Sequence, residues 1–303
     1  MTTTATGVKT RRRRAFTRGD RATLVSFVGV PTFLHLLLVW IPAILTILLS
    51  FTYWNGVKLS AIHWAGIQNY VTIFTKTPLF WEALRNNAYW LLWFTFIATP
   101  LGILLAYQID RQIRGHKFYE SIYYLPVVLS LAVIGIIWQF ILGPGGFVQG
   151  VFGRDIGNAI PILGNDKINT YIVLSIASWR HIGYIMLLYL AGLKSVDPAL
   201  REAGALDGAT EWQSFKRIIF PSMKPVNTII IVITVIESLR AFDLIYILYG
   251  TSSGWPILGM LVFRNIYGQS ASMLGAAYAV ILLILSITPI VFYLRTVFRE
   301  DNP

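Results

Sequence analysis

The sequence predicts an all-α integral membrane protein with six transmembrane helices. Of its 303 residues, 55% are hydrophobic and only 13% are charged, and the mean hydropathy is +0.62. A soluble globular domain normally carries fewer apolar and more charged residues. A soluble all-helical bundle is the alternative, but soluble core helices are seldom this long and this apolar on every face.

Six apolar runs are long enough to cross the roughly 30 Å hydrocarbon core of a bilayer as helices. In chain order they cover residues 24–54, 87–109, 119–142, 169–193, 225–248 and 271–296. Within the first run, Pro31 and Pro42 each remove a helical hydrogen bond, so this run is long enough to hold a kink. The fourth run is the least regular, because the sequence ASWRHIGY interrupts it.

The positions of Lys and Arg predict that both termini lie in the cytoplasm. With the N-terminus inside, most of the 25 Lys and Arg residues fall in cytoplasmic segments, which is the usual bias of membrane proteins. The net charge of +11 then reflects orientation, and nucleic-acid binding need not be invoked. The predicted organisation is a basic cytoplasmic tail (residues 1–23), a six-span domain (24–298) and a short cytoplasmic tail (299–303).

The N-terminal sequence RRRRAF has the look of a twin-arginine export signal. The apolar segment that follows is far longer than such a signal contains, and it shows no convincing small-residue cleavage site. We expect instead a tail that keeps the first span in its orientation and contacts anionic membrane lipid.

Residues 195–225, which we call the polar hairpin, interrupt the apolar sequence and have the pattern of two short helices. Asp197 is a suitable N-cap for the first helix, and Pro198 suits its first position. The pair Asp207-Gly208 indicates a turn between the helices.

Each helix of the polar hairpin carries an apolar face. These faces consist of Leu200, Ala203 and Leu206 in the first helix, and Trp212, Phe215, Ile218 and Ile219 in the second. The second helix begins with a capping box formed by Thr210 and Gln213, and Pro221 is expected to end it. One alternative is an incidental amphipathic loop. A DNA-binding helix-turn-helix is disfavoured, because membrane spans tether both ends of the hairpin.

The polar hairpin resembles the EAA signature of the permease subunits of bacterial ABC importers. That signature reads E-A-A, three residues, G, nine residues, I, one residue, L-P, and the chain keeps every spacing with Glu202, Ala203, Gly208, Ile218 and Pro221. Asp207 belongs to the D-G-A that follows in the carbohydrate branch, the maltose and glycerol-phosphate type. Gly204 and Phe220 depart from the signature, and Gly204 lowers helix propensity by about 1 kcal/mol relative to alanine. The runs YYLPVVLSLAVIGIIWQFIL and FDLIYIL are also similar to this family, so the resemblance covers roughly residues 25–298.

The resemblance implies a type I ABC importer permease, a multi-pass protein of the bacterial cytoplasmic membrane and not an enzyme. The hairpin would be the coupling helix, docking an ATPase through Glu202, Ala203, Gly204, Asp207, Gly208, Ile218 and Pro221. The implied partners are a second homologous permease, two ATP-binding subunits and an extracytoplasmic solute-binding protein. ATP and Mg would bind to the ATPase, since this chain has no G-x-x-x-x-G-K phosphate loop.

The resemblance implies a sugar or oligosaccharide as cargo. A glycerol phosphate ester is an alternative that would favour further cations along the path, where only Arg180 and Arg240 lie within the expected spans. A less favoured alternative is an integral-membrane enzyme that uses the intramembrane carboxylates on a lipid-linked substrate.

Charged residues within the expected spans predict where the cargo passes. In the fifth span, Glu237, Arg240 and Asp243 recur at spacings of three and project from one side of the helix. Such groups are too costly to face lipid, so they form an i, i+3 ion-pair ladder, contact cargo, or do both. Trp179 and Arg180 of the fourth span offer an aromatic face and a guanidinium, which suit a sugar.

Hydrolytic and metal chemistry fit the sequence poorly. Residues 250–254 match the hydrolase pattern G-x-S-x-G, but they fall in an expected outer loop rather than between a strand and a helix. The chain has no Cys, and its histidines (His35, His63, His116 and His181) lack metal-ligand spacing. We therefore expect no catalytic residue, no metal site and no cofactor in this chain.

Overall fold

The structure, a computed structural model, describes residues 17–54, 59–111, 114–143, 145–152, 166–250, 255–267 and 273–300. The described residues are almost entirely helical, as the composition predicts. One short antiparallel sheet pairs β1 (Thr52–Tyr53) with β2 (His63–Trp64). The chain divides into two compact units, residues 1–48 and 49–303. The GTSSG sequence lies mostly outside the described residues, as does most of the basic tail.

The first unit consists of a long apolar helix with a wide turn in it. Its segments are α1 (Arg18–His35), the π-helical η1 (Leu36–Trp40) and α2 (Ile41–Leu49). Thr17 caps α1 in a capping box with Asp20, and the hydrogen bond from the Thr17 backbone lowers the pKa of the Asp20 carboxyl. The helix continues through Pro31 in α form. The most apolar 18 residues of Ala22–Leu49 have a mean hydropathy of 2.3 and none of them is buried, as expected of a lipid-facing span.

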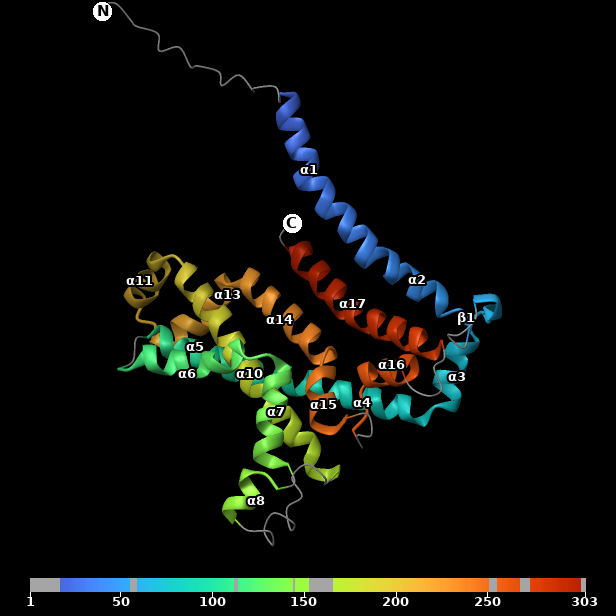
Figure 1. Cartoon of the computed structure of the whole chain (residues 1–303). Coiled ribbons are helices and arrows are strands. Elements are labelled where there is room, and N and C mark those ends of the chain that lie inside the picture. The colour runs from blue at the N-terminus through green and yellow to red at the C-terminus, as the bar shows by residue number, and fades with distance from the viewer. Residues whose placement is uncertain are drawn as a thin grey trace, which may run out of the picture. The chain divides into compact units, whose positions relative to one another are not determined.

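The second unit contains the other helices (Figure 1). Outside the polar hairpin they are η2 (Leu59–Ala61), α3 (Gln68–Lys76), α4 (Pro78–Trp93), η3 (Phe94–Ala98), α5 (Thr99–Asp110), α6 (His116–Val128), α7 (Leu131–Leu142), α8 (Phe147–Phe152), α10 (Asp166–Ser195), α14 (Lys224–Leu239), α15 (Phe242–Tyr249), α16 (Leu258–Tyr267) and α17 (Leu274–Glu300).

Five helical segments of the described chain are long and apolar enough to cross a membrane. Besides Ala22–Leu49, they are Pro78–Asp110, Leu131–Val151, Thr170–Ser195 and Leu274–Arg295. The predicted span over residues 225–248 is not one continuous helix, because α14 ends at Leu239 and α15 begins at Phe242. In the last turn of α14 the Ser238 hydroxyl donates to the Val235 carbonyl at 2.8 Å, a local bond that competes with the helical ladder.

The predicted span over residues 119–142 is also interrupted. Helix α6 ends at Val128, and α7 begins at Leu131. The Ser130 hydroxyl accepts a hydrogen bond from the Val133 amide at 3.2 Å, which caps α7 and separates it from α6.

Three π-helical segments share one cause. Segments η1, η3 and η4 (Phe215–Ile219) each end two residues before a proline, at Pro42, Pro100 and Pro221. A proline lacks the N–H donor and its ring clashes with the carbonyl four residues earlier, and a wider turn relieves this clash.

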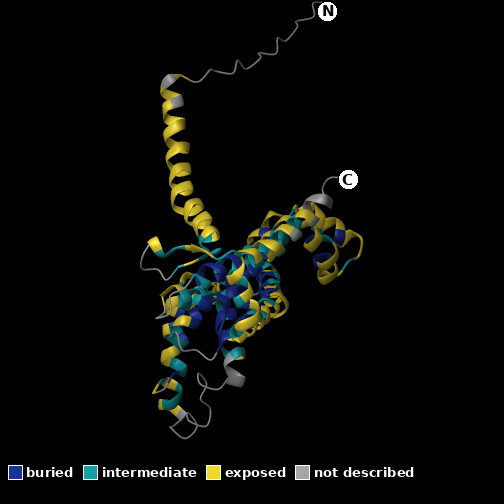
Figure 2. Ribbon diagram, turned by 90° about the vertical axis from the view of Figure 1, so that its right-hand side faces the viewer, coloured by how far each residue is buried: buried dark blue, intermediate teal, exposed yellow. Residues whose placement is uncertain are grey.

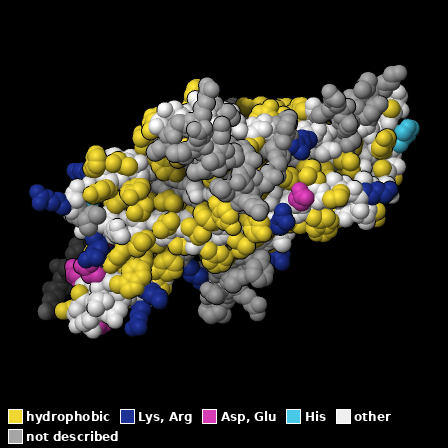
Figure 3. Space-filling view, turned by 90° about the horizontal axis from the view of Figure 1, so that it is seen from below, with side chains coloured by type: hydrophobic (Ala, Val, Ile, Leu, Met, Phe, Trp, Pro, Cys, Tyr) yellow, Lys and Arg dark blue, Asp and Glu magenta, His cyan; other side chains and the backbone are white. Residues whose placement is uncertain are grey.

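Buried side chains of the second unit form three clusters, and one of them lies where α5 packs along α10. At Gly102 of α5, an added Cβ atom would lie 2.9 Å from the Ile182 carbonyl oxygen, so only glycine permits this approach of the two helices. Figure 2 shows the buried residues concentrated in this unit. Hydrophobic side chains also cover much of the surface in Figure 3, as expected where lipid is the solvent.

Candidate functional site

The first half of the polar hairpin forms α11 (Pro198–Leu206) with the predicted cap and turn. The Asp197 carboxylate accepts a hydrogen bond from the Ala199 amide at 2.9 Å. Asp207 is the C-cap, and Gly208 has φ of 75°, a left-handed conformation that favours glycine.

The second half comprises α12 (Glu211–Ser214), η4 and α13 (Phe220–Ser222). The predicted capping box is confirmed, because Thr210 and Gln213 exchange hydrogen bonds of 2.9 and 3.3 Å between side chain and backbone. The prediction that Pro221 ends this helix is wrong: Pro221 lies inside α13, and the wide turn of η4 accommodates its ring.

The polar hairpin has one exposed and one buried side. Glu202 and Ala203 of the signature are exposed, and Leu206 of the predicted apolar face is 89% exposed. On the other side, Phe215 and Ile219 are buried against α5 and α10.

Gly204 is the point where α11 approaches η4. It is buried, and an added Cβ atom would lie 2.7 Å from Cδ1 of Ile218 and 3.2 Å from Oγ of Ser214. Glycine in place of the alanine of the signature therefore lets α11 pack closely against η4. Helix propensity alone did not predict this role of Gly204.

Two ion pairs that sequence reasoning missed join the hairpin to the end of α5. Asp110 binds Arg201 with an O–N distance of 2.7 Å, and the neighbouring Arg111 pairs with Glu211. The pairs lie along a cavity of about 340 Å³ between α5 and the hairpin. Their partners are far apart in sequence, so no local pattern indicates them.

Among the intramembrane charges, Arg180 of α10 pairs with Glu237 of α14 at 3.3 Å. The predicted ladder along one helix is not formed, because Arg240 lies in the break after α14. Arg240 and Asp243 are exposed and make no ion pair with another described residue.

Three of the five predicted path residues line one small cavity. This cavity has a volume of about 20 Å³ and is lined by Arg180, Glu237 and Arg240 together with Trp90 and His181. Such a volume holds about one water molecule. The Nε1 atom of Trp90 and the Nε atom of Arg180 are buried donors without a hydrogen-bond partner among the described residues. The other two path residues lie elsewhere: Trp179 meets Trp138 edge-on at 6.1 Å, and Asp243 belongs to α15.

His181 belongs to a buried polar network, centred on Thr99, that the sequence analysis did not predict. Its Nε2 atom lies 3.2 Å from Oγ1 of Thr99, which lies 3.1 Å from Oγ1 of Thr234. Phe94 stacks on the imidazole at 4.2 Å. The network joins α5, α10 and α14, and its only sequence signal is the presence of polar side chains inside apolar runs.

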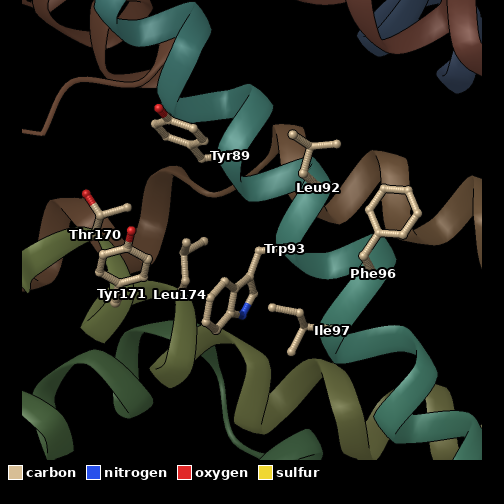
Figure 4. Close-up of a pocket in the computed structure, with 8 residues that line it drawn as sticks. All are labelled: Tyr89, Leu92, Trp93, Phe96, Ile97, Thr170, Tyr171 and Leu174. Atoms are coloured by element: carbon tan, nitrogen blue, oxygen red, sulfur yellow. The ribbon is translucent and has the colours of Figure 1, made fainter.

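A larger cavity of about 470 Å³ lies between α4, η3 and α10 (Figure 4). Trp93, Phe96, Ile97, Leu92 and Leu174 give it an apolar wall, and Tyr89, Thr170 and Tyr171 add hydroxyl groups. None of the predicted path residues lines it. Trp93 is held in place because its indole donates to the Ser178 hydroxyl at 2.8 Å.

Within the described part of the chain, no three His, Cys, Asp or Glu side chains are grouped so as to hold a metal ion.

Comparison with known proteins gives consistent matches. Residues 98–300 match the family model described as binding-protein-dependent transport system inner membrane component. A protein of Pyrococcus horikoshii named as an ABC transporter permease is 30% identical, covering 91% of this chain and 94% of that protein. AmyD of Thermoanaerobacterium thermosulfurigenes, named as a permease for starch degradation products, is 30% identical, covering 89% of this chain and 92% of AmyD.

A solved structure has the same fold. The crystal structure of a bacterial ABC transporter involved in the import of the polysaccharide alginate contains a chain that matches with a TM-score of 0.76 at 23% identity, covering 92% of this chain and 96% of that chain. The family match spans more than half of the sequence and includes the polar hairpin and the charged spans. This protein is therefore a multi-pass membrane transport component and not an enzyme, and it belongs to the family of binding-protein-dependent transport system inner membrane components.

Proposed function

We propose that this chain is the permease subunit of an ATP-driven importer for a sugar or oligosaccharide, and that the polar hairpin docks a separate ATPase. The observation that carries the proposal is the exposed side of the hairpin. Glu202, Ala203 and Leu206 are presented to solvent by a helix whose ends are fixed by caps. A rigid apolar surface with a carboxylate is suited to a protein partner.

The remaining signature residues shape this surface. Gly204 and Ile218 hold the two halves of the hairpin together, and Asp207, Gly208 and Pro221 set its turn and its exit. The working assembly would contain a second homologous permease, two ATP-binding subunits on the cytoplasmic side and a solute-binding protein outside. Both termini of this chain would lie in the cytoplasm.

A sugar cargo is supported by chemistry and by relatives. AmyD is named for starch degradation products, and the solved transporter imports a polysaccharide. Arg180, Glu237 and Arg240, with Trp179 and Asp243 nearby in sequence, would form the path. The unpartnered donors on Trp90 and Arg180 would bind sugar hydroxyl oxygens when the small cavity opens.

The test is purification of the chain from its native membrane, followed by an ATPase assay in proteoliposomes with its solute-binding protein. We expect an ATPase and a second permease to co-purify, and ATP turnover to rise when the binding protein carries a sugar. The cargo screen includes starch oligosaccharides, pentoses, uronate oligosaccharides and a glycerol phosphate. Stimulation by the phosphate ester alone would overturn the sugar assignment, and recovery of the chain without an ATPase would overturn the proposal.

The docking role of Glu202 has its own variant. Glu202→Lys is expected to lose the ATPase during purification, because it reverses the charge of an exposed docking residue. Glu82→Lys makes the same change at an exposed position of α4, on the other side of the membrane in the predicted topology, and is expected to keep the ATPase. Retention of the ATPase and normal uptake by Glu202→Lys would show that this residue is not a docking residue.

A further inference from the structure

The end of α5 holds both halves of the polar hairpin by charges of opposite sign. Asp110 binds Arg201 of α11 at 2.7 Å, and Arg111 pairs with Glu211 of α12. The last residue of α5 and its C-cap thus reach two helices of the hairpin. Because the two pairs have reversed polarity, exchanging partners would place like charges together, so the pairs fix one arrangement of the hairpin.

Arg201 adds a third element to this junction. Its second terminal nitrogen donates to the Leu193 carbonyl at 3.0 Å, near the end of α10. The guanidinium therefore lies near the C-terminal ends of α5 and α10, where helix dipoles favour a cation. The Asp110 side chain is only 13% exposed, which makes this pair less screened than an ordinary surface pair.

Aromatic packing supports the ion pair between Arg111 and Glu211. The Arg111 guanidinium lies 5.7 Å from the centre of the Tyr107 ring. That ring contacts Trp212 at 5.5 Å and Phe215 at 4.7 Å on the hairpin. The charges and rings together leave α5 with few ways to move independently of the hairpin.

Helix α5 leads directly to the polar network inside the membrane. It begins at Thr99, which binds His181, and it has 12 residues, which corresponds to about 18 Å of rigid helix. The close approach at Gly102 keeps α5 against α10 over this length.

We propose that Asp110–Arg201 and Arg111–Glu211 form an ion-pair clamp that makes α5 move with the polar hairpin as one body. Through α5, the clamp transmits hairpin movement to the network of Thr99, His181 and Thr234. Asp110 and Arg111 are positioning residues in this role, because they act through α5 and do not touch cargo. The inference rests on the proposed function, in which an ATPase moves the hairpin.

The first test measures the coupling ratio, sugar transported per ATP hydrolysed, for the assembled transporter in proteoliposomes. Asp110→Arg and Arg201→Asp are each expected to lower this ratio roughly tenfold, as loss of a partly buried charge-assisted bond implies. The double variant is expected to recover only part of the ratio, because it restores the ion pair but not the bond to the Leu193 carbonyl. Arg114→Glu is the matched control, since Arg114 is exposed and makes no ion pair with a described residue.

The possible outcomes distinguish a failure of the clamp from a failure of the proposed function. Failure of the unaltered chain to assemble with an ATPase contradicts the proposed function. Single variants that assemble and keep the normal ratio contradict the clamp, and so does a double variant as impaired as the singles. A purely structural role would lower the yield of complex and leave the ratio unchanged.

A covalent lock tests the clamp without relying on a loss of function. Because the chain has no Cys, Arg111→Cys with Glu211→Cys introduces the chain's only thiol pair. The two substitutions remove one ion pair of the clamp, so joining the thiols with a short reducible cross-linker is expected to raise the coupling ratio above that of the unlinked variant. Transport that stops on cross-linking and returns on reduction would show that α5 and the hairpin must separate, and would overturn the clamp.

Discussion

Gly204 illustrates how one missing methyl group sets the packing of the polar hairpin. An added Cβ atom would meet Cδ1 of Ile218 at 2.7 Å. Alanine would favour the helix by about 1 kcal/mol, whereas overpacking costs about 1–3 kcal/mol. We expect Gly204→Ala to lower the thermal unfolding temperature of the purified chain, measured by intrinsic fluorescence in detergent.

The control for this prediction removes the clashing atom. Ile218→Val lacks Cδ1, so the double variant Gly204→Ala with Ile218→Val is expected to be more stable than Gly204→Ala alone. A double variant with the lower unfolding temperature would show that the contact with Ile218 is not the cause.

Replacing the two intramembrane carboxylates, Glu237 and Asp243, is expected to have different effects on stability and on sugar uptake. Glu237 pairs with Arg180, and both side chains are less than one third exposed. Glu237→Gln leaves the Arg180 charge without a carboxylate, so we expect a loss of stability of about 1–3 kcal/mol, below the range for fully buried pairs. Asp243 is exposed and makes no ion pair with a described residue, so Asp243→Ala is expected to alter sugar uptake and leave the unfolding temperature unchanged.

Unfolding and uptake measured side by side decide this prediction. Equal unfolding temperatures of Glu237→Gln and Asp243→Ala would mean that the Arg180–Glu237 pair contributes nothing to stability. Unchanged uptake of every sugar by Asp243→Ala would remove Asp243 from the path.

At the scale of elements, the capping box decides whether the second half of the hairpin is formed. Thr210→Val removes the hydroxyl that accepts the Gln213 amide, at a cost of about 0.5–2 kcal/mol. We expect faster hydrogen exchange in residues 211–219 and no change in α11, measured by mass spectrometry. Thr75→Val, at an exposed threonine in the last turn of α3, is the control. Equal hydrogen exchange in Thr210→Val and Thr75→Val would show that the cap does not limit opening of the helix.

Local features were predictable from sequence, whereas contacts between distant segments were not. The caps at Asp197 and Thr210 and the turn at Gly208 were predicted because their determinants lie within a few residues. The charges of Arg180 and Glu237 were also identified, but the expected pairing of Glu237 ran along its own helix, since spacing is the only geometry that sequence offers. The breaks in the third and fifth spans depend on serine hydroxyls whose choice of partner follows from packing.

At the scale of the whole molecule, the predicted orientation has a direct test. Thr75 of α3 is expected outside the cell and Arg114 inside, and both are exposed. A membrane-impermeant maleimide is expected to label Thr75→Cys in intact cells, and Arg114→Cys only after permeabilisation. The unaltered chain contains no Cys and provides the unlabelled control. Labelling of Arg114→Cys in intact cells would reverse the topology.

The wide turn η3 also changes the register of the helix that contains it. The buried face runs through Phe80, Trp90 and Phe94 before this turn and through Ala98, Gly102, Ala106 and Ile109 after it. Within the turn, the Thr99 amide bonds the Phe94 carbonyl, five residues earlier instead of four. The wide turn thus holds one residue more than a regular helix would. Deleting a single residue within Phe94–Ala98 would close the wide turn to a regular one and leave the faces of α4 and α5 aligned. Deleting a residue within α5 itself, which is a regular helix, would rotate the end of α5 by about 100°. Asp110 and Arg111 would then point away from the polar hairpin, although neither residue had been changed.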